Sequence, residues 1–167
     1  MNLEEAIKTA IDYEIKVRDS YLKSVDKIMD ETGRRVFAVL GKEEQGHVDF
    51  LQTKLAEWRS TGHIKDDKLG TVVPAKKVID EGVRKLDAHL ATRDFGTELE
   101  MLRKALALEE ETSNFYRRMV AQMKQEGHMF ERFLEIEVGH QAIVQAEIDY
   151  LTRSGTFFDF QEFNLDY

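Results

Sequence analysis

Two short motifs in the chain combine a carboxylate with an imidazole at helical spacing. Glu44 precedes His47 by three residues, and Glu137 precedes His140 by the same step. Side chains three apart on a helix share one face, and carboxylate with imidazole is a donor set for iron, manganese or zinc. Two further acids interrupt apolar helical faces elsewhere in the chain. We therefore predict six metal ligands: Glu14, Glu44, His47, Glu109, Glu137 and His140.

Hydrophobic periodicity predicts four long helices that position these residues. They run from about Leu3 to Asp30, from Arg34 to Arg59, from Thr97 to Lys124 and from His128 to Thr152. Asn2 with Glu5, and Thr97 with Glu100, form capping-box patterns at two of the starts. Gly33 and Gly127 are the expected tight turns between the paired helices.

The two halves of the chain resemble each other. Ala10, Glu14 and Tyr21 recur at the same spacing as Ala105, Glu109 and Tyr116, and each half continues with a Glu-x-x-His step. Within each antiparallel hairpin, the lone Glu lies as far from the turn as the Glu-x-x-His step. The first Glu therefore faces the Glu and His of the neighbouring helix.

These features predict one all-α domain spanning 1–167, a four-helix bundle of two helical hairpins. The hairpins cover 2–60 and 97–153, a long crossover covers 61–96, and a short aromatic tail covers 154–167. A single long crossover is the topology of ferritin-like bundles. The crossover contains the chain's one proline, Pro74, and a short helix is expected there from Val78 to Leu90.

The negative charge of four carboxylates in a helical core indicates that the six residues bind metal ions. Buried carboxylates cost several kcal/mol each unless charge or hydrogen bonds compensate them. No Lys or Arg occupies a neighbouring core position. Two divalent cations would neutralise four carboxylates while both histidines stay neutral.

Composition excludes several other classes of protein. The chain has 32 acidic and 24 basic residues and a net charge of −8, which argues against general nucleic-acid binding. The absence of cysteine excludes disulfides, Cys-ligated zinc and iron–sulfur clusters. The longest apolar run, Val36 to Leu40, is too short to span a membrane, and the first residues do not read as a signal peptide. We therefore expect a cytoplasmic protein with no membrane partner.

The motifs together resemble the ferritin-like di-iron carboxylate superfamily, and within it the rubrerythrin-like branch. The resemblance covers all four predicted helices, about two thirds of the chain. An aromatic ending also resembles tails of that branch. The matching residues are Ala10-x3-Glu14-x6-Tyr21, Glu44-x2-His47, Ala105-x3-Glu109-x6-Tyr116, Glu137-x2-His140, and the tail Gly155, Phe157, Phe158, Phe160 and Phe163.

The resemblance implies two iron ions (Fe2+/Fe3+) and an oxidoreductase that reduces hydrogen peroxide in oxidative-stress defence. Dioxygen is a second candidate oxidant, and manganese or zinc are alternative metals. Rubrerythrins proper carry a four-cysteine rubredoxin site, so this cysteine-free chain would need an external electron-donor protein such as a rubredoxin. They also tend to carry a further Glu where this chain has Thr112, which puts their redox-linked iron shift in doubt. A homodimer is expected, and the long crossover permits a domain-swapped one.

Two other classes of function remain open on the sequence. One is ferritin-like iron oxidation and storage or sequestration, which a cage of many subunits would favour. The other is a metal-free helical interaction module, which the core carboxylates disfavour.

Several residues near the motifs have alternative interpretations. Tyr21 and Tyr116 are either ordinary core aromatics or hydrogen-bond donors to ligand carboxylates across the bundle, and the resemblance favours the second. The aromatic tail is either a flap over one end of the bundle or a dimer contact. Heptad phase favours Glu109 over Glu110 and Glu111, and we expect the following residues to lie in solvent or loops: Glu43, Glu135, His63, His89 and His128.

Overall fold

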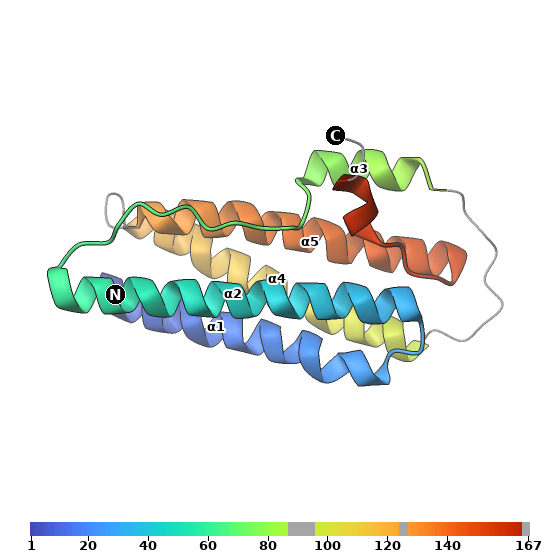
Figure 1. Ribbon diagram of the computed structural model, residues 1–167, viewed down its shortest axis with the longest axis horizontal. Helices are drawn as coiled ribbons and strands as arrows, with labels where there is room; N and C mark the ends of the chain where they lie inside the picture. The colour runs from blue at the N-terminus through green and yellow to red at the C-terminus, as the bar shows by residue number, and fades with distance from the viewer. Residues whose placement is uncertain (87–95, 124–126, 165–167) are drawn as a thin grey trace.

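The computed structural model describes residues 1–86, 96–123 and 127–164, and within these ranges all the regular secondary structure is helical (Figure 1). The all-α prediction is confirmed. The α-helices are α1 (Leu3–Ser24), α2 (Glu31–Thr61), α3 (Lys76–Arg84), α4 (Gly96–Gln122) and α5 (His128–Ser154), and two 3-10 helices are η1 (Val25–Lys27) and η2 (Phe160–Asn164).

The four long helices form a bundle of two hairpins. α1 packs along α2, α4 packs along α5, and contacts between α1 and α4 join the two pairs. A capping box at Asn2 and Glu5 starts α1, as the sequence predicts. Gly155, at a φ of 78°, ends α5 in the left-handed conformation that glycine adopts without strain.

The first turn differs from the prediction. α1 ends at Ser24 instead of continuing to Asp30, because η1 and an extended Ile28 turn the chain there. Asp30 is the N-cap of α2, and its side chain accepts a hydrogen bond from the backbone of Gly33. Gly33 therefore lies in the first turn of α2. An added Cβ at Gly33 would lie 2.6 Å from the ring of Phe157, so close packing explains this glycine.

The second hairpin also begins differently from the prediction. α4 starts at Gly96, so Thr97 lies inside the helix and is not its N-cap. The expected end of this helix at Lys124 lies outside the described residues. Gly127 is the N-cap of α5, and its φ of −89° is one that any residue can adopt.

The described part of the crossover runs back along the bundle after α2 ends (Figure 1). It contacts α5 through the carbonyl oxygen of Leu69, which accepts a hydrogen bond from Arg132. It contacts α2 through Val72, whose N–H donates to Glu43. The short predicted helix corresponds to α3, which packs on α5 and η2. Its predicted continuation to Leu90 includes residues 87–90, which are outside the described ranges.

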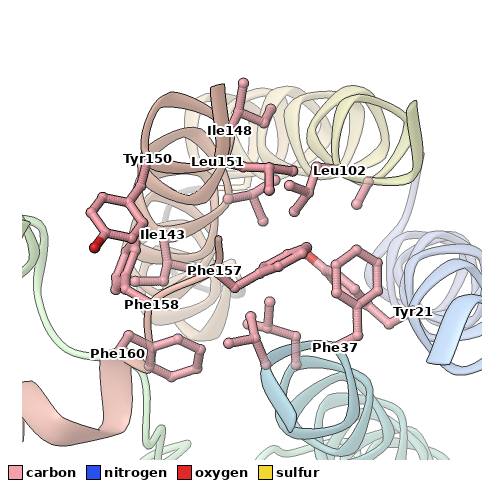
Figure 2. Close-up of a cluster of buried hydrophobic side chains, with 14 of the residues drawn as sticks. Tyr21, Phe37, Leu102, Ile143, Ile148, Tyr150, Leu151, Phe157, Phe158 and Phe160 are labelled. Atoms are coloured by element: carbon pink, nitrogen blue, oxygen red, sulfur yellow. The ribbon is translucent and has the colours of Figure 1, made fainter. Parts of the chain in front are cut away.

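Apolar side chains form two buried clusters, one toward each end of the bundle. Figure 2 shows the cluster that contains Tyr21 and Phe37, with Phe157 of the tail inserted beside them. Phe157, Phe158 and Phe160 are at most 5% exposed, so the tail packs on its own chain as a flap. Burial of each such side chain contributes about 1.5–3 kcal/mol, which anchors this end of the bundle.

Among the helices that the structure describes, none combines the length and the apolar character needed to cross a lipid bilayer.

Candidate metal centre

Six buried polar side chains from the four long helices meet in the core of the bundle. The spacing of three residues puts each Glu-x-x-His pair on the inner face of its helix, α2 or α5. Each of the six is at most 1% exposed. The structure therefore brings together all the residues that the sequence singled out: Glu14 of α1, Glu44 and His47 of α2, Glu109 of α4, and Glu137 and His140 of α5.

The first half of the centre surrounds His47. Its Nδ1 atom lies 3.1 Å from Oε2 of Glu44, 3.2 Å from Oε1 of Glu137 and 3.3 Å from Oε2 of Glu14. One ligand atom from each of these four residues lies within 4.8 Å of the others. The group can therefore hold one ion with oxygen and nitrogen donors.

The second half surrounds His140 in the same way. Its Nδ1 atom lies 2.7 Å from Oε1 of Glu44, 3.5 Å from Oε1 of Glu109 and 3.8 Å from Oε2 of Glu137. One ligand atom from each of these four residues again lies within 4.8 Å of the others. Glu44 and Glu137 belong to both groups, with a different Glu44 oxygen turned toward each histidine. These two carboxylates occupy the positions from which a ligand can bridge two ions.

Two tyrosines orient the remaining carboxylates from across the bundle. The hydroxyl of Tyr21 donates to Oε1 of Glu109 at 2.6 Å, and the hydroxyl of Tyr116 donates to Oε1 of Glu14 at 2.5 Å. Burial and the nearby carboxylates raise the pKa of both tyrosines well above the ordinary value. Both phenols therefore stay protonated and act as donors.

Four groups at the centre hold protons more tightly than usual. Burial and the charges of Glu109 and Glu14 raise the pKa of Glu44 to about 8. Burial and the neighbouring carboxylates raise the pKa of Glu137 well above its ordinary range. Burial lowers the pKa of His47 and of His140, but the surrounding carboxylates outweigh it and raise both well above the ordinary value.

The other two carboxylates are ionised. Burial raises the pKa of Glu14, but His47 and the hydrogen bonds to this side chain lower it to about 2. Burial also raises the pKa of Glu109, but hydrogen bonds and the charge of His140 outweigh burial and lower it below the ordinary value. Without a metal, protons must therefore compensate most of the charge that four buried carboxylates bring.

Unsatisfied atoms show that the residues fit metal ions. Several buried atoms of the centre make no hydrogen bond within the described residues, although buried polar atoms are nearly always paired. Ions between the carboxylates and imidazoles would bind these oxygens directly. The donor set of oxygen and imidazole nitrogen suits iron, manganese or zinc and does not choose among them. The unpaired atoms include Oε2 of Glu44, Oε2 of Glu109 and both carboxylate oxygens of Glu137.

The prediction that Glu43 lies in solvent is wrong. Its side chain is only 8% exposed. It accepts hydrogen bonds from the Thr71 hydroxyl and the Val72 N–H, both at 2.6 Å, and from Nε2 of His140 at 3.1 Å. Burial raises the pKa of Glu43, but His140 and these hydrogen bonds lower it to about 2.

The position of Glu43 gives it a role in orienting His140. Its Oε2 atom also lies 4.0 Å from Nε2 of His47, which is beyond hydrogen-bond distance, and this nitrogen makes no hydrogen bond within the described residues. The rings stack with centroids 5.3 Å apart. A carboxylate at Nε2 keeps Nδ1 turned toward the metal positions. Heptad phase did not single out Glu43, because its burial depends on Thr71 and Val72 of the crossover.

Other candidate residues lie away from the centre. Glu135, His63 and His128 are exposed, as expected, and Glu110 and Glu111, which flank the preferred ligand, are exposed as well. His89 lies outside the described residues. Thr112 is buried, and its hydroxyl donates to the Leu108 carbonyl of its own helix.

A comparison of the chain with protein-family models, with curated proteins and with solved structures finds no match.

Proposed function

We propose that this protein is a non-haem di-iron oxidoreductase of the ferritin-like, rubrerythrin-like type. It reduces hydrogen peroxide to water with electrons from a separate donor protein such as a rubredoxin, and acts in defence against oxidative stress. The observation that carries the proposal is the pair of equivalent donor groups that share Glu44 and Glu137. Two metal positions with two common carboxylates are suited to two-electron chemistry.

The chain's own residues would hold the ions in fixed positions. Glu14 and His47 would serve one ion, Glu109 and His140 would serve the other, and Glu44 and Glu137 would be available to both. Four carboxylates and two neutral imidazoles balance two dications, so a filled centre is electrically neutral. Manganese or zinc could occupy the same donors, but only a metal with accessible redox states supports this reaction.

The overall reaction is H2O2 + 2e− + 2H+ → 2H2O, in which the O–O bond breaks and each oxygen leaves as water. Iron bound in the centre would supply the two electrons, and the external donor protein would replace them. The hydroxyls of Tyr21 and Tyr116 donate hydrogen bonds to Oε1 of Glu109 and of Glu14, which would leave Oε2 of each carboxylate for metal. The apolar clusters on both sides limit the entry of water.

Rapid mixing tests the proposal. Anaerobic protein loaded with two ferrous ions per chain is mixed with hydrogen peroxide, and separately with dioxygen, while iron oxidation is followed by absorbance. We expect peroxide to oxidise the protein-bound iron faster than it oxidises free ferrous ion, and faster than dioxygen does. Glu137→Gln should abolish this advantage, whereas Glu135→Gln, an exposed change on the same helix, should preserve it.

Two outcomes would overturn the peroxidase assignment. Oxidation by peroxide no faster than in free solution would remove it altogether. Faster reaction with dioxygen, together with retention of many ferric ions per chain in a large assembly, would indicate the iron-storage alternative.

A further inference from the structure

A second site lies at the end of the bundle where α2 ends and α5 begins. Here α2, residues 62–69 of the crossover and the first turns of α5 line an open pocket of about 680 Å³. This volume falls in the range of pockets for small organic molecules. The pocket is separate from the metal centre, because the ring of Phe133 lies between them, 5.6 Å from the ring of His47.

The inner wall of the pocket is aromatic and apolar. Phe50, Trp58 and Ile64 are only partly buried by their own chain, and Phe133 forms the inner limit. Phe50 and Phe133 pack edge to face with centroids 5.8 Å apart. Half-buried aromatic side chains around a cavity favour a ligand with an apolar body.

The wall formed by the crossover is held in place before any ligand binds. The buried Lys54 donates from Nζ to the Lys65 carbonyl at 2.9 Å and to Asp67 at 2.7 Å. Glu57 accepts a hydrogen bond from the backbone N–H of Lys65 at 3.1 Å. A pre-formed wall reduces the entropy cost of binding.

The lining of the pocket carries more basic than acidic side chains, although the protein has a net charge of −8. Lys54 is paired with Glu57 and Asp67, and Arg132 is paired with Glu135, which leaves Lys65 and Lys68 against Asp66. Arg132 uses Nε for the Leu69 carbonyl and Nη1 for Glu135. Among the described residues, its Nη2 has no partner and can donate to a ligand.

We propose that this pocket binds an organic anion with an apolar body. The anionic head would interact with Arg132 and the two lysines at the mouth, and the body would pack against Trp58, Phe50 and Phe133. This ligand class combines the charge of the mouth with the apolar wall, which a bare inorganic anion or an organic cation cannot do.

Fluorescence tests the proposal directly, because Trp58 is the only tryptophan in the chain. The full-length protein is titrated with anilinonaphthalene sulfonate while the emission of Trp58 is followed, and equilibrium dialysis gives the stoichiometry. We expect saturable quenching at one molecule per chain. Decanoate should displace the dye, whereas decylammonium and inorganic phosphate should not.

Substitutions locate the binding site. Arg132→Gln should weaken binding about tenfold or more, as expected for the loss of a hydrogen bond from a charged group. Lys68→Gln, at an exposed position, should weaken it less and gives a second test if the first variant does not fold. Arg117→Gln, an exposed change on α4 outside the pocket, is the matched control and should leave affinity unchanged.

Four results would overturn the proposal: no saturable binding, equal binding of decylammonium, unchanged affinity in both pocket variants, or loss of dye binding on zinc loading. Loading the protein with zinc should leave the dissociation constant within about twofold. Loss of dye binding on zinc loading would instead assign the dye to the metal centre. Dye binding requires no redox chemistry. Failure of the dye to bind would therefore leave the proposed peroxidase activity standing, and failure of the peroxide assay would leave the proposed pocket ligand standing.

Discussion

Loading the metal centre should expel about four protons per chain at pH 7. In the metal-free protein, Glu44 has a pKa of about 8, and the pKa values of Glu137, His47 and His140 are raised well above their ordinary values, which favours the protonated form of each. Metal ligation requires ionised carboxylates and imidazoles with a free Nδ1. Each of the four groups therefore loses one proton, while Glu14 has none to lose.

The sign of the pH dependence follows from the same shifts. Because the protons compete with the metal, affinity should fall as pH falls. With a pKa of about 8, Glu44 is already ionised in the metal-free protein at higher pH. The number of protons released should therefore drop by about one between pH 7 and pH 9.

A pH-stat titration in weakly buffered solution counts these protons directly. Manganous ion, which is stable in air, is added to metal-free protein, and the base needed to hold pH 7 is recorded. Glu44→Gln should release about one proton fewer and bind metal more weakly, whereas Glu135→Gln should match the unmodified protein. Release of two protons or fewer would refute the reasoning, because it would mean that Glu44 and Glu137 are ionised before metal arrives.

Two further predictions concern residues outside the ligand set. Glu43→Gln should weaken metal binding about 10–100-fold, because Nε2 of His140 loses its carboxylate partner; competition with a chelator measures this, and unchanged affinity would contradict the orienting role. Glu147 is fully buried on α5, and burial together with Asp30 and Asp159 raises its pKa well above the ordinary value, despite the opposing Phe158 amide. A raised folded-state pKa stabilises the protein below about pH 4.5, and this stabilisation is lost as pH rises toward the folded-state pKa. Glu147→Gln should therefore gain stability relative to the unmodified protein by about 1.4 kcal/mol per pH unit in that window, and a gain independent of pH in denaturant titrations would show that the carboxyl is not protonated there.

The sequence was sufficient for the helical class and for the inward-facing residues. Helical periodicity is a local property, so the spacing of Glu44 and His47 places both on one face whatever packs against that face. The internal repeat then related this pair to Glu137 and His140. Helix ends were less accurate, because Asp30 serves as a cap for α2 only once α1 has ended at Ser24.

Tertiary structure decided the features that depend on segments far apart in the chain. Glu43 is buried because Thr71 and Val72 of the crossover cover it, and no periodicity within α2 reports that contact. Gly33 matters because Phe157 of the tail packs against it. The pocket beside Trp58 and Arg132 likewise exists only where α2, the crossover and α5 come together. A helix face is specified by its own residues, whereas burial by a distant segment depends on the path of the whole chain.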